Sequence, residues 1–170
     1  MSINIRYENL EDQELIYSLI DECFESDDEE KLVRLLHTDN QSLVSLVAEV
    51  EGKIVGQIIL SKMTTEKDSN LSIYGLAPMC VAPDYQKSGI GTRLIEKAII
   101  EAKKHNIDAI FVLGHPSYYP KFGFKMTSLY QIKCEYDVPA EVFMVLDMSG
   151  KLVSLKNQTV YYAEEFGKVF

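Results

Sequence analysis

The stretch Val81–Ile99, VAPDYQKSGIGTRLIEKAI, constrains the fold most, because an apolar run ends at a proline and two glycines then open an amphipathic helix. A helix start has backbone N–H groups without intrahelical partners and the positive end of the helix dipole. No carboxylate caps this start, and Gly89 and Gly91 lack the Cβ atoms that would keep a bulky anion away. Side-chain donors or positive charge come from four more residues: Gln86, Lys87, Ser88 and Thr92. The stretch predicts a phosphate or pyrophosphate site, with a plain glycine turn as the alternative.

Two familiar phosphate-binding motifs do not match this stretch. The P-loop requires Gly-Lys-Ser/Thr after four spacer residues, and that pattern is absent. The dinucleotide-binding motif requires a third glycine at position 94, which holds leucine, and an acidic residue about 20 residues further on. A nucleotide-binding protein that uses this loop for another phosphate is a weaker hypothesis, because it leaves the later Tyr-x-x-x-Gly-Phe segment, Tyr119 to Phe124, unexplained.

Two helices are predicted near the beginning of the chain. Between Tyr7 and Glu30, eleven acidic residues and no lysine or arginine accompany apolar residues at helical spacing. This pattern is typical of an amphipathic helix with an acidic outer face, here capped by Asn9. A second, shorter helix is predicted over Glu29–Leu36, and Ile3–Arg6 alternates like an edge strand.

The period of the apolar residues then changes to that of strands. Leu43–Val50 and Ile54–Met63 flank a glycine turn and predict a hairpin, and Leu71–Val81 predicts a third strand. The central helix is expected over Ile90–His105. The remaining predicted elements are a buried strand, one helical turn and a last strand: Ala109–Leu113, Ser117–Phe122 and Glu141–Met148. This order favours an α/β or α+β fold.

Length and composition favour a single soluble domain. At 170 residues, with 46% hydrophobic and 25% charged residues, the chain can bury one core. We expect one domain over residues 1–170, with its core over 2–148 and a mixed tail over 151–170. No apolar run approaches the roughly 18 residues of a membrane span, and no signal-peptide pattern is present. A net charge of −9 argues against binding to nucleic acid, and three scattered cysteines suggest reduced thiols in the cytoplasm.

Two motifs in this order resemble a known family. The first is Val81-Ala82-Pro83 followed by Gln86-Lys87-Ser88-Gly89-Ile90-Gly91-Thr92, which resembles the coenzyme A pyrophosphate loop of the GNAT-type N-acetyltransferases, Gln/Arg-x-x-Gly-x-Gly/Ala. The second, about 30 residues later, is a tyrosine four residues before a Gly-Phe pair, here Tyr119 and Gly123-Phe124. The whole segment GHPSYYPKFGF is closer still to the YhbS-like predicted acetyltransferases.

The resemblance implies a mixed, mostly antiparallel central sheet with two splayed parallel strands in the middle and helices on both faces. Pro78 supports the splay independently, because a proline inside a strand is confined to edges and bulges. The implied cosubstrate is acetyl-CoA, without a metal, and the acetyl group passes directly to an amine. Backbone groups of three residues are implied to hold the pantetheine arm, with an N–H of the first or second polarising the thioester carbonyl: Met79, Cys80 and Val81. The pyrophosphate is implied to lie on the loop residues Gln86, Lys87, Ser88, Gly89, Ile90, Gly91 and Thr92.

The resemblance also makes Tyr119 the general acid that donates a proton to the departing CoA thiolate, with packing of an aromatic corner as the alternative. Cys80 is expected to be a small buried residue rather than a nucleophile. Leu71–Val81 contains no carboxylate that could act as general base. Water or one of four side chains is left for that role: Glu22, Glu25, His115 or Glu141.

The sequence therefore predicts an acetyl-CoA-dependent N-acetyltransferase that acts on a primary amine of a small molecule or a protein. The alternative is a CoA-binding or regulatory module without activity, which the missing strand carboxylate favours and the retained Tyr119 disfavours. The acidic helix face either attracts a polyamine, an aminoglycoside or a lysine-bearing partner, or is simply solvated. We expect a cytoplasmic protein that binds neither nucleic acid nor membrane, and a homodimer is one candidate assembly.

Overall fold

Seven strands form the central sheet, in the order β1-β2-β3-β5-β6-β9-β7, in the computed structural model, which describes residues 2–170. These strands span Ile3–Tyr7 (β1), Ser42–Val50 (β2), Lys53–Lys62 (β3), Ile73–Val81 (β5), Ala109–Leu113 (β6), Phe143–Asp147 (β9) and Lys125–Met126 (β7). Three further strands form a small second sheet in the order β4-β10-β8. They span Thr64–Thr65 (β4), Thr159–Tyr161 (β10) and Lys133–Cys134 (β8).

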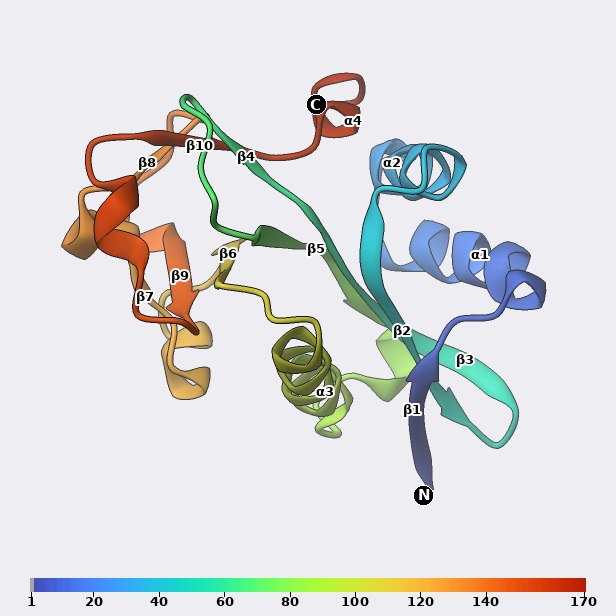
Figure 1. Cartoon of the computed structure of the whole chain (residues 1–170). Helices are drawn as coiled ribbons and strands as arrows, with labels where there is room; N and C mark the ends of the chain where they lie inside the picture. Colours follow the sequence, from blue (N-terminus) through green and yellow to red (C-terminus); the bar gives the residue numbers. More distant parts are fainter. Residues whose placement is uncertain (1) are drawn as a thin grey trace.

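Helices cover both faces of the central sheet, as Figure 1 shows. Helices α1 (Gln13–Cys23) and α2 (Asp28–Thr38) lie on one face, and α3 (Ile90–Lys104) lies on the other. The short helix α4 (Glu164–Gly167), near the end of the chain, lies beside α2. Most apolar residues of the helices are buried against the sheet, for example Ile20 on α1, whereas Leu15 of α1 and Ile100 of α3 are exposed. The amphipathic patterns seen in the sequence therefore build the core on both sides of one sheet.

The central sheet opens between its two parallel neighbours, β5 and β6. The two strands pair over only three positions, the last of which joins Gly75 to Phe111. Beyond that point β5 stays paired with β3, whereas β6 stays paired with β9. The strands diverge from there, so the predicted fork between two parallel strands is confirmed.

A bulge in β5 lies at the start of this fork. Leu76 pairs with Leu60 of β3, and Met79 pairs with Ile58, so β5 contains one extra residue in this interval. Pro78 lies inside the interval, where its missing N–H interrupts no ladder bond. The bulge predicted from this proline is confirmed.

The predicted elements agree with the observed ones to within two residues at most ends. Asn9 caps a short 3₁₀ turn, η1 (Leu10–Asp12), which leads into α1. One acidic residue of that region is not on the outer face: Asp12 is 6% exposed and pairs with Arg6 at 2.7 Å. The tail also differs from expectation, because its buried side chains join the central core: Leu152, Leu155, Val160, Tyr162 and Phe166.

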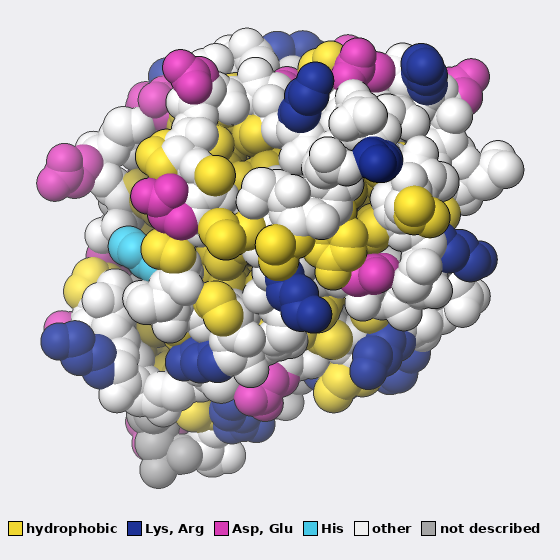
Figure 2. All heavy atoms as spheres, turned by 90° about the vertical axis from the view of Figure 1, so that its left-hand side faces the viewer, with side chains coloured by type: hydrophobic (Ala, Val, Ile, Leu, Met, Phe, Trp, Pro, Cys, Tyr) yellow, Lys and Arg dark blue, Asp and Glu magenta, His cyan; other side chains and the backbone are white. Residues whose placement is uncertain are grey.

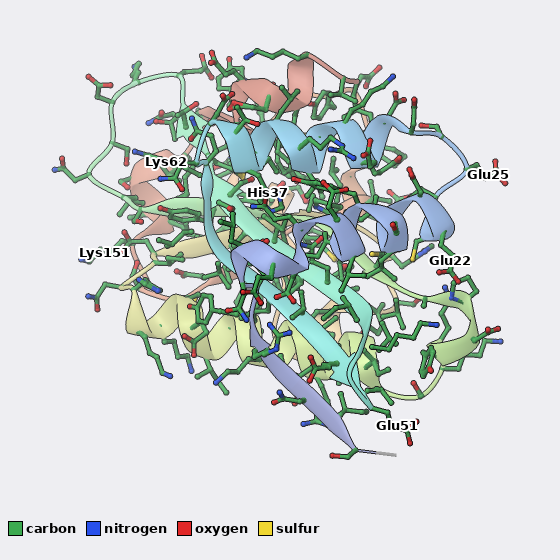
Figure 3. The ribbon with its side chains drawn as sticks, turned by 90° about the vertical axis from the view of Figure 1, so that its right-hand side faces the viewer. Glu22, Glu25, His37, Glu51, Lys62 and Lys151 are labelled. Atoms are coloured by element: carbon green, nitrogen blue, oxygen red, sulfur yellow. The ribbon has the colours of Figure 1, made fainter. Side chains whose placement is uncertain are left out.

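Apolar and charged side chains are distributed unevenly over the surface. On the face that carries β7, β8 and β9, apolar side chains gather towards the centre and charged groups lie around them (Figure 2). On the opposite side, α1 and α2 lie in front of the sheet, and α3 is visible below them (Figure 3). No helix in the described part of the chain is long and apolar enough to cross a membrane.

Candidate functional site

The loop between β5 and α3 presents a continuous run of free backbone amides. Between Lys87 and Thr92, none of the six N–H groups has a hydrogen-bond acceptor within residues 2–170. The next amide, of Arg93, donates to the Gly89 carbonyl at 3.1 Å and begins the helical ladder. Lys87 (φ +60°) and Gly89 (φ +86°) have left-handed backbone, and Gly89 directly precedes the right-handed turns of α3. Free amides in such a conformation form a nest for an anion.

Gly91 leaves space beside these amides. A Cβ atom at this position would lie 3.4 Å from the Tyr118 hydroxyl and 3.9 Å from the Met79 Cε. Those are ordinary contacts, so packing within the chain does not require a glycine here. The Tyr118 hydroxyl lies 3.3 Å from Thr92 Oγ1, and Lys121 Nζ lies 4.1 Å from the centroid of the Tyr118 ring. Gly91 therefore lies beside one hydroxyl, that of Tyr118, and the apolar ends of Met79 and Val81.

Beyond the fork, the edge of β5 that faces away from β3 has no partner strand among the described residues. Met79, Cys80 and Val81 pair with β3 on their other side. The side-chain amide of Gln86 donates a hydrogen bond from Nε2 to the Val81 carbonyl at 3.0 Å, which joins the loop to the end of β5. The predicted pantetheine-binding residues therefore line one unpaired strand edge next to the amide nest.

Cys80 is buried, as the sequence predicts, with 7% of its surface exposed. The Cys23 thiol beside it and its burial raise the pKa of the Cys80 thiol well above its ordinary value. A thiol with a raised pKa is a poor nucleophile at neutral pH, because the thiolate is the reactive form. Cys80 therefore fits the role of a buried core residue on β5 and not that of a nucleophile.

Tyr119 occupies a rigid corner directly after β6. It begins the 3₁₀ turn η3 (Tyr119–Phe122), which is shorter than the predicted turn and ends at Gly123 with φ +99°. The ring lies against Gly114, where a Cβ atom would be only 2.2 Å from the ring. Its centroid lies 5.5 Å from that of Phe124 and 6.5 Å from that of Phe122. The absent side chain of Gly114 and the two neighbouring rings fix the direction of Tyr119.

The hydroxyl of Tyr119 is protonated and free. No side chain within the described residues hydrogen-bonds it, and it is not among the buried polar atoms that lack a partner, so it contacts solvent. Burial and the neighbouring Tyr118 raise the pKa of Tyr119 to about 12. A thiol has a pKa of about 8.5. Tyr119 is thus suited to donate a hydrogen bond to a departing sulfur, whereas complete transfer of its proton would be uphill.

The structure leaves all four candidate general bases exposed: Glu22, Glu25, His115 and Glu141. Figure 3 shows Glu22 and Glu25 at the end of α1 and in the loop after it, at the edge of the molecule. The segments that carry His115 and Glu141 run side by side, because the Gly114 N–H donates to the Val142 carbonyl at 2.9 Å. Within residues 2–170, no hydrogen bond holds any of the four side chains towards Tyr119.

Tyr162 is a site residue that sequence reasoning missed. Its ring covers Gly75, where a Cβ atom would lie 2.6 Å from it, and Gly75 is the last residue of β5 paired with β6. Burial, chiefly, raises the pKa of Tyr162, and the nearby Tyr119 adds to this effect. An interior strand glycine signals close approach by another group. That signal was present in the sequence, but it does not say which residue approaches.

These features together can hold an anion at the nest, an extended amide chain along β5, and a reacting carbonyl near Tyr119. Within the part of the chain that the structure describes, no three His, Cys, Asp or Glu side chains are grouped as a metal site would require.

Comparisons with curated proteins agree with this arrangement. YhbS of Escherichia coli K12, named as an uncharacterised N-acetyltransferase, is 28% identical over 154 residues, which cover 90% of this chain and 92% of YhbS. YjhQ of the same organism, also named as an uncharacterised N-acetyltransferase, is 44% identical over 84 residues, which cover 48% of this chain and 46% of YjhQ.

Solved structures show the same fold. The structure of YhbS from Escherichia coli in complex with CoA matches with a TM-score of 0.91 and 28% identity, over 97% of this chain and 92% of YhbS. A GNAT family acetyltransferase from Brucella melitensis in complex with acetyl-CoA matches with a TM-score of 0.82 and 25% identity, over 97% and 98% of the two chains. Residues 13–124 match the model of the acetyltransferase (GNAT) family. The resemblance read from the two motifs is thereby confirmed, and the chain belongs to the acetyltransferase (GNAT) family.

Proposed function

We propose that this chain transfers the acetyl group of acetyl-CoA directly to a primary amine of a small molecule or protein. The observation that carries the proposal is the run of free amides from Lys87 to Thr92, placed next to an unpaired edge of β5. The amides and the dipole of α3 suit a pyrophosphate. The two similar structures that hold CoA and acetyl-CoA support the same ligand for this chain.

The free edge of β5 is proposed to hold the pantetheine arm. The arm contains amide groups that can pair with Met79, Cys80 and Val81 as an added strand would. An N–H of Met79 or Cys80 would then donate to the thioester oxygen as negative charge develops on it. The fork beside Leu113 provides the opening through which an amine meets that carbonyl.

Tyr119 is proposed to assist the departure of the thiol. The amine nitrogen attacks the thioester carbon, the carbon–sulfur bond breaks, and the electron pair of that bond leaves with sulfur. Tyr119 donates a hydrogen bond to this sulfur, and the thiolate takes its final proton from solvent when the pH lies below its pKa. The raised pKa of Tyr119 keeps the hydroxyl in its donating form throughout the physiological pH range.

The proton of the acceptor ammonium is proposed to leave through water. All four candidate bases are exposed, and Leu71–Val81 contains no carboxylate. The ammonium loses one proton to solvent before it binds, and the nitrogen loses a second proton to water after it attacks the carbonyl, so neither proton needs a dedicated side chain. The rate should then rise with pH until the acceptor amine itself is deprotonated.

The test is thiol release from acetyl-CoA by the purified chain across a panel of primary amines, with mass spectrometry of the acetylated product. We expect one free thiol for each acetylated amine. Binding of CoA without thiol release for any amine would support the inactive-module alternative, which the absence of a strand carboxylate favours.

A further inference from the structure

A cavity of about 300 Å³ opens at the fork between β5 and β6. Leu76 and Ala77 line it from β5, just after the last residue of that strand that pairs with β6. Leu113, the last residue of β6, lines it from the other strand. The cavity therefore lies where β5 and β6 separate, beside the proposed thioester site.

The rest of the cavity wall is aromatic and comes from the C-terminal part of the chain. Tyr136, Tyr162, Phe166 and Phe170 line it. The ring centroids of Tyr136 and Tyr162 are 6.1 Å apart, and those of Tyr162 and Phe166 are 4.9 Å apart, so the rings form one continuous wall. Leu113 of the cavity wall directly precedes Gly114, on which the Tyr119 ring lies. The cavity thus lies next to the segment that carries the proposed leaving-group donor.

The lining of this cavity contains no Asp, Glu, Lys or Arg among the described residues. A polyamine or an aminoglycoside would leave further charged or hydroxyl groups unpaired inside it, which costs free energy. An apolar group gains free energy by burial against the rings. The volume lies at the lower end of the roughly 300–1,000 Å³ range of small-molecule sites. One ring or a short branched chain is therefore the group that suits the space.

We propose that the acceptor is a small primary amine whose amino group is joined by a short chain to an aryl or branched alkyl group, and that this cavity holds that group. The inference rests on the acetyl transfer proposed above. It assigns the choice of amine to the aromatic wall and not to the acidic surface of α1, whose Glu22 lies at the edge of the molecule (Figure 3).

A second cavity, of about 450 Å³, offers a competing place for a cationic acceptor. It shares Tyr162 with the first cavity, but Glu135, Glu164 and Glu165 line it with a single lysine, Lys62. Both carboxylate oxygens of Glu165 are buried without a partner in residues 2–170. A diamine would gain more from these carboxylates than from the aromatic wall, so a diamine distinguishes the two cavities.

The test compares 2-phenylethylamine, putrescine and ethanolamine as acceptors, by thiol release from acetyl-CoA and by calorimetric binding in the presence of CoA. We expect kcat/KM for 2-phenylethylamine to exceed that of each other amine at least tenfold. Phe170 is 58% exposed, so its replacement leaves the core intact. Phe170→Ser should lower the ratio of 2-phenylethylamine to ethanolamine kcat/KM about tenfold, because one apolar wall is lost. Val153→Ser, at a position 79% exposed and outside the cavity, should keep the ratio.

Three other outcomes separate the parts of the inference. A higher kcat/KM for putrescine assigns the acceptor to the acidic cavity, and an unchanged ratio in Phe170→Ser shows that the aromatic wall does not select. If no amine releases thiol although acetyl-CoA binds, the proposed acetyl transfer fails. Calorimetry then tests by itself whether the aromatic cavity binds an amine. Binding of 2-phenylethylamine that weakens in Phe170→Ser then supports it as an amine site, and no binding overturns it.

Discussion

At the scale of single residues, two glycines at the fork allow two tyrosine rings to lie directly on the backbone. Gly75 lies under Tyr162 and Gly114 lies under Tyr119, with hypothetical Cβ atoms 2.6 and 2.2 Å from the rings. A Cβ atom does not come within 3 Å of a ring carbon, so even an alanine at either position would displace the ring. The two rings therefore flank the fork in fixed positions, and the unused hydroxyl of Tyr119 is available for a ligand.

Replacing Tyr119 by phenylalanine tests its proposed role. We expect Tyr119→Phe to lower kcat roughly 10²-fold, the usual scale for loss of one donor to a transition state. Acetyl-CoA affinity should change little, because the ring and its packing remain. The loss should shrink with an acetyl thioester whose thiol is more acidic than CoA. Near-normal turnover in Tyr119→Phe would assign the residue to packing alone.

Two substitutions at Gly91 separate anion binding from folding. A Cβ at this position makes only ordinary contacts, and alanine is a better helix former than glycine by about 1 kcal/mol. We expect Gly91→Ala to fold at least as well as the parent and to keep CoA binding. Gly91→Val should lose CoA affinity at least tenfold, because its methyl groups fill the space beside the free amides. Equal CoA dissociation constants for the two variants, measured by calorimetry, would contradict the assignment of the loop.

At the scale of elements, Glu101 ties α3 to the first strand of the sheet. Its carboxylate accepts hydrogen bonds from Lys104 Nζ at 2.9 Å and from the Tyr7 hydroxyl at 2.8 Å, and pairs with Lys97 Nζ at 3.4 Å. The bond from Lys104 contributes most, followed by that from Tyr7, to lowering the pKa of Glu101 to about 2. The carboxylate is thus stabilised in the folded chain relative to the unfolded chain.

The pH dependence of the stability against urea tests the contribution of the Glu101 carboxylate. The unfolded glutamate has a pKa of about 4.3, so the stabilisation is complete above that pH and disappears as the pH falls through about 2. We expect Glu101→Gln to unfold at lower urea concentration than the parent at pH 7, and the difference to narrow between pH 4 and pH 2. Glu96→Gln, at an exposed position of the same helix, is the matched control. A difference that persists at pH 2 would mean that packing, and not charge, is lost.

The elements also show how far a sequence can specify this fold. Proline and glycine signal backbone events directly, so the bulge at Pro78, the start of α3 and the corner at Gly123 follow from residue types alone. The strands of the small sheet have two or three residues each, too few for any period. The contact between Gly75 and Tyr162 joins positions far apart in the chain. Neither residue type nor spacing encodes such a pairing, so the aromatic wall could not be predicted.

At the scale of the whole molecule, the C-terminal part of the chain adds an aromatic wall to the site that the earlier residues form. The nest, the fork and Tyr119 all lie within residues 73–123, and the family match ends at residue 124. The aromatic wall comes from later residues that pack back onto β5. Cofactor recognition and acceptor recognition are therefore proposed to occupy separate parts of one chain. Substitutions in the wall should change acceptor preference without changing acetyl-CoA affinity.

Thermal unfolding in the presence of ligands tests the whole binding surface at once. A ligand that binds only the folded chain at 100 times its dissociation constant stabilises it by about 2.7 kcal/mol. For a chain of this length each 1 kcal/mol corresponds to about 2–4 °C, so saturating CoA should raise the Tm by about 5–10 °C. At equal concentration, ATP should give a smaller shift, because it has no arm for the free edge of β5, and pantetheine should also give less, because it has no pyrophosphate for the nest. A shift by ATP equal to that by CoA would identify the loop as a general nucleotide site and leave the unpaired edge of β5 without a ligand.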